Sequence, residues 1–193
     1  MNEAEVTLAI LAEGRGERMG KPKGLLKIGD QPILTYLLRR FNWHGPTMLV
    51  TSPGREKPPG AEDFDLEVVD PVEGKGPVQG VLTALENSTT EHLIVASVDM
   101  PLAEREQLLW LIEKIENKSG LMIQHQNELQ PFPSIIHKKR AGRPLSDSMR
   151  ALTKIPNFAV IDAPKHWPQE IWTNLNDPAD LAAFQDLTGF RIQ

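Results

Sequence analysis

The chain has 193 residues, with 21 lysines and arginines against 26 aspartates and glutamates, so its formal net charge is -5. This length predicts a single domain over residues 1–193, and the acidic balance argues against a nucleic-acid binder that neutralises phosphates over a broad surface. Cysteine is absent, which excludes disulfides, thiolate nucleophiles and zinc sites built on cysteine.

The N-terminal residues do not look like a targeting segment. Residues 1–5 carry acids where a signal peptide has basic residues, and the apolar run 6–12 is too short for a membrane span. We therefore expect a cytoplasmic protein that uses no membrane and no nucleic acid.

Apolar, β-branched runs alternate with helix-like stretches through the first half of the chain. Strands are expected over 6–12, 47–51, 66–70 and 92–99, and helices over about 77–86 and after residue 102. Asp30 is placed to cap a further helix, with Pro32 in its first turn and apolar residues every three or four positions up to Phe41. This alternation predicts an α/β fold with parallel strands and crossover helices.

The second half is less regular, with strands expected over 121–124, 134–137 and 159–162 and short helices near 145–152 and 179–187. Parallel open sheets bind ligands at the carboxyl ends of their strands. The loop 13–24, Asp70 and Asp99 all follow predicted strands of the first half. We therefore expect these three features to form one pocket.

The loop 13–24 combines glycines with four basic side chains, Arg15, Arg18, Lys21 and Lys23. Backbone amides without side chains nearby can cradle phosphates. The glycine spacing is not that of the dinucleotide fingerprint, and Pro22 after Lys21 excludes a Walker loop. A solvated basic loop is the alternative interpretation.

Asp99 and Asp70 each end a predicted strand. A lone carboxylate at such a place suits Mg²⁺, which takes one or two carboxylates and completes its shell with water and phosphate oxygens. The competing interpretation is an acid that caps a helix or stabilises a turn.

Several blocks of the sequence together resemble one known family. Leu11-Ala12-Glu13-Gly14, Arg18-Met19-Gly20 and Lys23-Gly24-Leu25-Leu26 resemble the L-A-G-G-x-x-x-R-M-G-x-x-K signature of the molybdenum cofactor guanylyltransferases, which belong to the nucleotidyltransferases. The resemblance continues through Asp70, residues 76–80, residues 99–102 and residues 174–181, in order along nearly the whole chain.

This resemblance implies a Rossmann-like three-layer sandwich with a mostly parallel sheet, similar to the nucleotide-diphospho-sugar transferases. It also implies magnesium-dependent transfer of GMP from GTP to the phosphate of molybdopterin or its molybdenum form, with release of pyrophosphate. The nucleotide-binding half would be residues 1–102 and the acceptor-binding half residues 103–193, with cofactor-delivery proteins as candidate partners.

The resemblance also assigns roles to individual residues. Leu11, Ala12 and Gly14 would contact guanine and ribose, Lys23 the triphosphate, Asp70 the nucleoside and Asp99 the magnesium, while Asn174 and Asn176 would lie by the pterin. The attacking group is already a phosphate anion and needs no general base, so charge stabilisation by Lys23, Arg18 and the metal would carry catalysis.

Glu13 departs from the family pattern, which has glycine at this position. A carboxylate about 4 Å from a triphosphate charge would cost about 4 kcal/mol at an effective dielectric near 20. Either the loop turns Glu13 outward, onto Arg15 or Arg18, or the protein has lost or changed its nucleotide. Residues 78–79, Val-Gln where Leu-Ala is usual, are a milder departure.

A second basic cluster comprises residues 138–140 with Arg143 and Arg150. One hypothesis is that Arg143 or Arg150 holds the acceptor's phosphate, and the alternative is a solvated surface run. Trp167 and Trp172 precede the Asn174 block and either line a pterin pocket or anchor the core. The five histidines have no ligand-like spacing.

Two rival functions stay open. A cytidylyltransferase or sugar-phosphate nucleotidyltransferase of the same fold would share these motifs, because one loop does not fix the base. The other rival, motivated by Glu13, is a degenerate nucleotide-binding partner protein in cofactor delivery.

Overall fold

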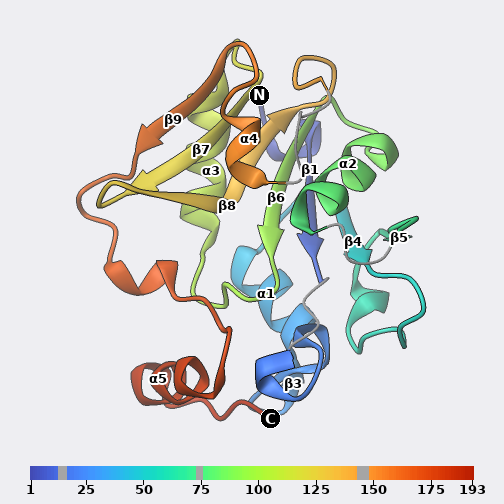
Figure 1. Cartoon of the computed structure of the whole chain (residues 1–193), viewed down its shortest axis with the longest axis vertical. Coiled ribbons are helices and arrows are strands. Elements are labelled where there is room, and N and C mark those ends of the chain that lie inside the picture. Colours follow the sequence, from blue (N-terminus) through green and yellow to red (C-terminus); the bar gives the residue numbers. More distant parts are fainter. Residues whose placement is uncertain (13–16, 73–75, 143–147) are drawn as a thin grey trace.

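One sheet contains strands from both halves of the chain. The structure, a computed structural model, describes residues 1–12, 17–72, 76–142 and 148–193. The order across the sheet is β5-β4-β1-β6-β8-β7-β9 (Figure 1). These strands are β1 (Val6–Leu11), β4 (Thr47–Thr51), β5 (Leu66–Val69), β6 (His92–Ser97), β7 (Gly120–His125), β8 (Glu128–His137) and β9 (Phe158–Asp162).

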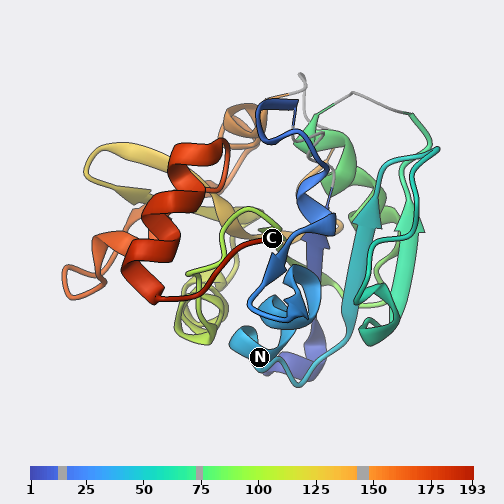
Figure 2. The same cartoon turned by 90° about the horizontal axis from the view of Figure 1, so that it is seen from below.

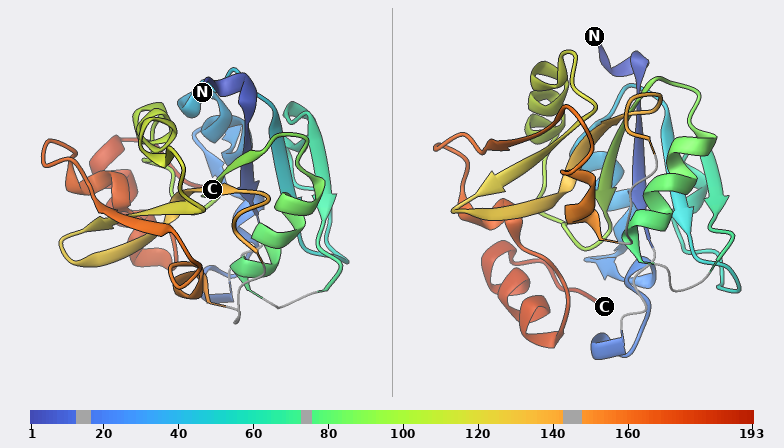
Figure 3. Two further views of the ribbon diagram at one scale, coloured as in Figure 1. Left: turned by 90° about the horizontal axis from the view of Figure 1, so that it is seen from above. Right: turned by 45° about the horizontal axis from the view of Figure 1, so that its top comes forward.

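Helices cover both faces of this sheet, as the resemblance predicted. Figure 3 shows α1 (Ile33–Phe41) and α3 (Arg105–Ile115) on one face, and α2 (Pro77–Asn87) and α4 (Met149–Leu152) on the other. The last helix, α5 (Pro178–Thr188), lies beyond the ends of β1 and β6, near the foot of the molecule in Figure 1. The result is a three-layer α/β sandwich.

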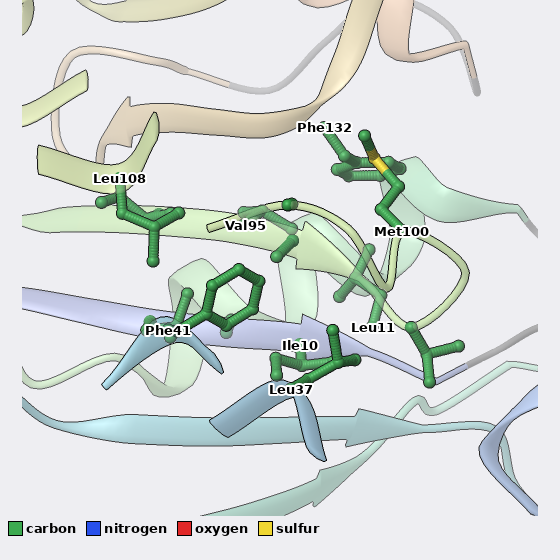
Figure 4. Packing of buried hydrophobic residues seen from close by; sticks show 14 of the residues in the cluster. Ile10, Leu11, Leu37, Phe41, Val95, Met100, Leu108 and Phe132 are labelled. Atoms are coloured by element: carbon green, nitrogen blue, oxygen red, sulfur yellow. The ribbon is translucent and has the colours of Figure 1, made fainter. Parts of the chain in front are cut away.

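The core forms because β1, an interior strand of the sheet, is buried on both faces and is apolar except for Thr7. All six residues of β1 are buried, as expected for a strand covered by helices on both sides. Figure 4 shows Leu37 and Phe41 of α1 beside Ile10 of β1, with Val95 of β6 and Leu108 of α3 close by. Each such side chain stabilises the fold by about 1.5–3 kcal/mol when fully buried.

Strand direction decides which loops can meet. β1 pairs in parallel with β4 and β6, β4 with β5, and β7 with β9. β8 is antiparallel to both β6 and β7. Every strand of the sheet except β8 therefore ends at one side, which we call the carboxyl edge.

The antiparallel β8 carries residues 138–140 of the second basic cluster to the other edge of the sheet. In its pairing with β6, His137 lies opposite His92, the first residue of β6. Residues 138–140 therefore lie at the edge opposite the carboxyl edge, where Lys138 donates to the carbonyl of Ser88 (2.6 Å) and Lys139 pairs with Glu91 (2.5 Å). These cations are not available to a ligand at the carboxyl edge.

The predicted cap of the first helix is wrong. Pro32, not Asp30, precedes α1, and its side chain forms no capping hydrogen bond. Asp30 lies with Gly29 in the turn of a short hairpin between β2 (Lys27–Ile28) and β3 (Gln31–Pro32). Gly29 has a φ of 61°, which glycine adopts without strain, so the Gly-Asp pair forms a hairpin turn.

Residues 191–193 pair with this hairpin through an isolated antiparallel bridge between Ile28 and Ile192. The backbones of Lys27 and Gln193 exchange hydrogen bonds of 2.8 and 2.9 Å, and Gly29 donates to the carbonyl of Arg191 (2.7 Å). Figure 2 shows the tail after α5 passing to the segment that contains β2 and β3. Within the described residues, no helix is long and apolar enough to cross a membrane.

Candidate active site

Lys23, Asp99 and Asn176 meet at the carboxyl edge although they are far apart in the sequence. The Nζ of Lys23 donates to Oδ2 of Asp99 (2.7 Å) and to Oδ1 of Asn176 (2.8 Å). Lys23 begins a short 3-10 helix (Lys23–Leu25) after the loop that follows β1, and Asp99 lies two residues beyond β6. Because β1 and β6 are parallel neighbours, the segments after them emerge side by side.

This cluster is largely withdrawn from water. The side chains of Lys23 and Asp99 are only 10% and 19% exposed. Charge-assisted hydrogen bonds of this kind are stronger than neutral ones, and more so where water is excluded. The arrangement holds one positive and one negative group ready for a ligand that carries both phosphate and a divalent cation.

Local hydrogen bonds hold the C-terminal segment against this cluster. The amide of Leu175 donates to the carbonyl of Asp99 (2.8 Å). Oδ2 of Asp180 accepts from the amides of Asn176 (2.7 Å) and Asp177 (3.1 Å), and Asp177 in turn caps α5. Asn176 is thereby presented to Lys23 by the start of a capped helix.

A cavity of about 310 Å³ lies next to Lys23, between the loops that follow β1 and β4. Its volume is at the small end of the range for ligand sites. A Cβ added to Gly24 would lie 3.5 Å from Cβ of Pro58 and 3.6 Å from Cβ of Ala12, within ordinary van der Waals contact, so the cavity is apolar around Gly24. The lining residues are Ala12, Pro22, Gly24, Leu25, Thr51, Ser52, Arg55, Glu56 and Pro58.

Asp70 provides a second acid at the carboxyl edge. It follows β5, its amide donates to the carbonyl of Thr51 (2.8 Å), and the residue is 3% exposed. Its Oδ1 is buried without a hydrogen-bond partner among the described residues. An unpaired buried acceptor is costly, so a hydroxyl of a bound ligand is a suitable partner for it.

Asp70 and Asp99 do not bind a common ion. Two strands, β4 and β1, lie between β5 and β6, which separates the ends of β5 and β6 by about 14 Å at the usual spacing of neighbouring strands. The two acids can instead contact different parts of one elongated ligand.

Asp99 by itself fits a magnesium ion that arrives with a nucleotide. In the described part of the chain, no three His, Cys, Asp or Glu residues are grouped to hold a metal. Magnesium is commonly held by one or two carboxylates, with water and phosphate oxygens completing the shell. The residue to hold the ion would be Asp99, and the nucleotide would supply further oxygens.

The remaining predicted site residues are placed as follows. Leu11 and Ala12 are buried at the end of β1. Arg18 is exposed in the 3-10 helix Glu17–Met19, and Arg150 is exposed on α4. Asn174 donates to the carbonyl of Trp172 (3.0 Å). Glu13, Gly14, Arg15 and Arg143 lie outside the described residues.

The two tryptophans anchor the segment that carries the asparagines. Trp167 and Trp172 are 4% and 6% exposed, with ring centroids 6.0 Å apart, and Trp167 also packs edge-to-face on Trp110 (5.4 Å). Their bulk lies in the core, and Nε1 of Trp167 donates to Glu106 (2.8 Å). Of the two interpretations given above, the structure supports core anchoring.

The wall of the cavity formed by residues 51–58 was not expected from the sequence. Three prolines and two glycines between 52 and 65 left the shape of this loop unpredictable. The position of the loop in the sequence could have indicated this wall. The loop follows β4, the parallel neighbour of β1, and therefore lies at the carboxyl edge.

The fold, the paired lysine and aspartate and the adjacent cavity define a nucleotidyltransferase. The chain belongs to the family described as MobA-like NTP transferase domain, whose model matches residues 8–156. The resemblance seen in the motifs is therefore confirmed.

Named relatives cover most of the chain. A probable molybdenum cofactor guanylyltransferase of Carboxydothermus hydrogenoformans is 27% identical over 188 residues, which cover 91% of this chain and 92% of that protein. The molybdenum cofactor guanylyltransferase of Vibrio cholerae serotype O1 is 23% identical and covers 95% of this chain and 93% of its own length.

Solved structures share the fold at low identity. Molybdopterin-guanine dinucleotide biosynthesis protein A of Archaeoglobus fulgidus superposes with a TM-score of 0.74 and 20% identity over 95% of this chain and 98% of the other. The 2-C-methyl-D-erythritol 4-phosphate cytidylyltransferase of Thermus thermophilus superposes with a TM-score of 0.64 and 18% identity, over 95% of this chain and 98% of the other.

Proposed function

We propose that this protein transfers GMP from magnesium-bound GTP to the phosphate of molybdopterin or its molybdenum form. The observation that carries the proposal is the ammonium of Lys23 held between Asp99 and Asn176. One cation there joins the nucleotide-binding half of the chain to the C-terminal segment, where the two reacting phosphates would meet.

The chemistry requires positioning more than proton transfer. An oxygen of the acceptor phosphate attacks the α-phosphorus of GTP, the bond between the α- and β-phosphates breaks, and pyrophosphate leaves. The attacking oxygen is already an anion, so the reaction needs no general base. A magnesium ion held by Asp99 would supply charge neutralisation, while Lys23 stabilises the charge that accumulates around the α-phosphate.

The nucleoside would extend from Lys23 along the carboxyl edge. The base would occupy the apolar cavity floored by Ala12 and Gly24, and the unpartnered Oδ1 of Asp70 suits a ribose hydroxyl. Asn174, Asn176, the exposed Arg150 and Arg143, which lies outside the described residues, are our candidates for acceptor contacts. The names of two relatives, both molybdenum cofactor guanylyltransferases, support the molybdenum cofactor as acceptor.

A different nucleotide or acceptor is the second candidate. A bifunctional GlmU protein of Thermodesulfovibrio yellowstonii is 29% identical over 153 residues, which cover 77% of this chain and 32% of that protein, and the cytidylyltransferase above shares the fold. Comparing consumption of GTP, CTP and UTP, each with molybdopterin and with sugar phosphates, separates these reactions.

A radiolabel assay tests the proposal directly. Label from α-³²P-GTP should appear on molybdopterin with wild type and should fall to background with Asp99→Ala. Full magnesium-dependent turnover by Asp99→Ala would refute the metal assignment.

Calorimetry with GTP on wild type and on Glu13→Gly tests the alternative that this protein is a degenerate nucleotide-binding partner in cofactor delivery. Binding that appears only after Glu13→Gly would favour a protein that has lost its nucleotide.

A further inference from the structure

Glu56 places a carboxylate in the wall of the cavity beside Lys23. It lies on the loop after β4 and lines the cavity together with Ala12, Gly24 and Pro58. Among the described residues, Glu56 forms no hydrogen bond or ion pair. The ammonium of its neighbour Lys57 is 2.7 Å from Glu67 and is therefore directed to a different acid.

The cavity combines an apolar lining with one acidic side chain, Glu56, and one basic side chain, Arg55. Ala12, Pro22 and Pro58 offer apolar surface on which a planar base can lie. Gly24 lines this space and directly follows Lys23, so a base bound there would be attached to a triphosphate that runs toward Lys23. The carboxylate of Glu56 accepts hydrogen bonds and donates none.

The four common bases differ in what they offer to such a carboxylate. Guanine presents two adjacent donors, N1–H and the N2 amine, whose spacing matches the two oxygens of a carboxylate. Adenine and cytosine present one amine beside an unprotonated ring nitrogen, which repels the second oxygen. Uracil presents a single N–H between two carbonyls, and both carbonyls repel a carboxylate.

We propose that Glu56 selects guanine by accepting hydrogen bonds from N1–H and the N2 amine. This inference rests on the proposed function and makes its substrate specific. Glu56 is exposed and lines the cavity proposed for the base, so its negative charge serves recognition of the base.

Inosine triphosphate provides the test, because it keeps N1–H and O6 of guanine but lacks the N2 amine. Calorimetry measures the dissociation constants of GTP, ITP and CTP, in magnesium, for wild type, Glu56→Gln, Glu56→Ala and Glu62→Gln. Glu62 is a matched control, since it is an exposed acid on the short 3-10 helix (Ala61–Asp63) that follows this loop, and it does not line the cavity. Thermal unfolding checks that each variant is folded.

Wild type and Glu62→Gln should bind GTP about tenfold more tightly than ITP. Glu56→Ala should bind GTP about 10- to 100-fold more weakly than wild type, the range for loss of hydrogen bonds to a charged group. This variant should bind GTP and ITP equally. The dissociation constant of Glu56→Gln for GTP should lie between those of wild type and Glu56→Ala, because the amide of glutamine keeps one acceptor oxygen.

Unchanged preference for GTP over ITP in Glu56→Ala overturns the role of Glu56 and leaves the proposed function standing. Tighter binding of CTP than of GTP by wild type overturns both the role of Glu56 and the choice of GTP. If wild type binds none of the three nucleotides, the proposed function itself fails.

Discussion

The ammonium of Lys23 lies 2.7 Å from the carboxylate of Asp99, across 76 residues of sequence. Each group balances the charge of the other in a place where water reaches neither freely. Removing one of them should therefore have two effects, because it takes a proposed ligand contact away and leaves the partner charge partly buried and alone.

Lys23→Met, which keeps the length of the side chain, should lower the rate of GMP transfer about 100- to 1,000-fold, the range for loss of one electrostatic contact to a transition state. Stability should fall by about 1–3 kcal/mol, because Asp99 loses its partner. Single-turnover kinetics and urea unfolding measure the two effects. Lys27→Met, at an exposed lysine of β2, should leave the transfer rate and the free energy of unfolding unchanged within error. Undiminished transfer by Lys23→Met would contradict the assignment of Lys23 to the triphosphate.

Asn176→Ala should raise the KM for the acceptor about tenfold and change the dissociation constant of GTP less than twofold. The reason is that Lys23 keeps its contact with Asp99 when the amide of Asn176 is removed, while the acceptor loses a neutral hydrogen bond and a positioning contact. Steady-state kinetics with each substrate varied in turn measures this. Asn117→Ala, at an exposed asparagine after α3, serves as control, and an effect on GTP alone would place Asn176 on the nucleotide side.

Two histidines should make the stability of the fold depend on pH. Burial lowers the pKa of both His92 and His137, whose rings lie 4.7 Å apart, and their mutual repulsion lowers the pKa of His92 further. The folded protein thus binds fewer protons than the unfolded chain, whose histidines titrate near pH 6.5. This contribution to stability is present above about pH 6.5 and is lost as the pH falls toward the folded-state pKa values.

His137→Gln should flatten this dependence, as measured by urea unfolding between about pH 7.5 and 5.5. His166→Gln changes an exposed histidine, 72% exposed, and should leave the slope unchanged. An unaltered slope in His137→Gln would show that another group titrates in this range.

Phe184 attaches α5 to the rest of the fold. It is 0% exposed, whereas Leu187 on the same helix is 51% exposed. Phe184→Ala should lower the free energy of unfolding by about 3–5 kcal/mol through loss of buried surface and creation of a cavity, and Leu187→Ala by less than about 0.5 kcal/mol. Urea unfolding of the pair measures the difference, and similar values for both would mean that α5 packs loosely.

The strands of the first half could be predicted because local signals there agree with the tertiary structure. Apolar runs bounded by turn residues predicted β1, β4, β5 and β6 to within two residues, and Pro77 correctly indicated the start of α2. The direction of β8 could not be predicted, since pairing depends on contacts between distant strands. The hairpin at Gly29-Asp30 was missed because an aspartate before a helical pattern also suits a helix cap.

The candidate site was predictable where sequence motifs coincide with strand ends. Asp70, Asp99 and Lys23 were all expected at one edge, and the structure places them there. Glu56 escaped prediction because no periodic pattern constrains a loop rich in proline and glycine. The position of the basic residues 138–140 could not be predicted, because it depends on the direction of β8, which carries them to the edge opposite the candidate site.

The pairing of residues 191–193 with β2 has a practical consequence for experiments. Gln193 pairs with Lys27, close in sequence to Lys23. A peptide tag or dye attached to Gln193 would therefore lie near the cavity in which nucleotide binding is to be measured. Met1 is 50% exposed and precedes the start of β1, on the far side of the sheet. Immobilisation or labelling through Met1 therefore leaves the carboxyl edge and its cavity accessible to nucleotides.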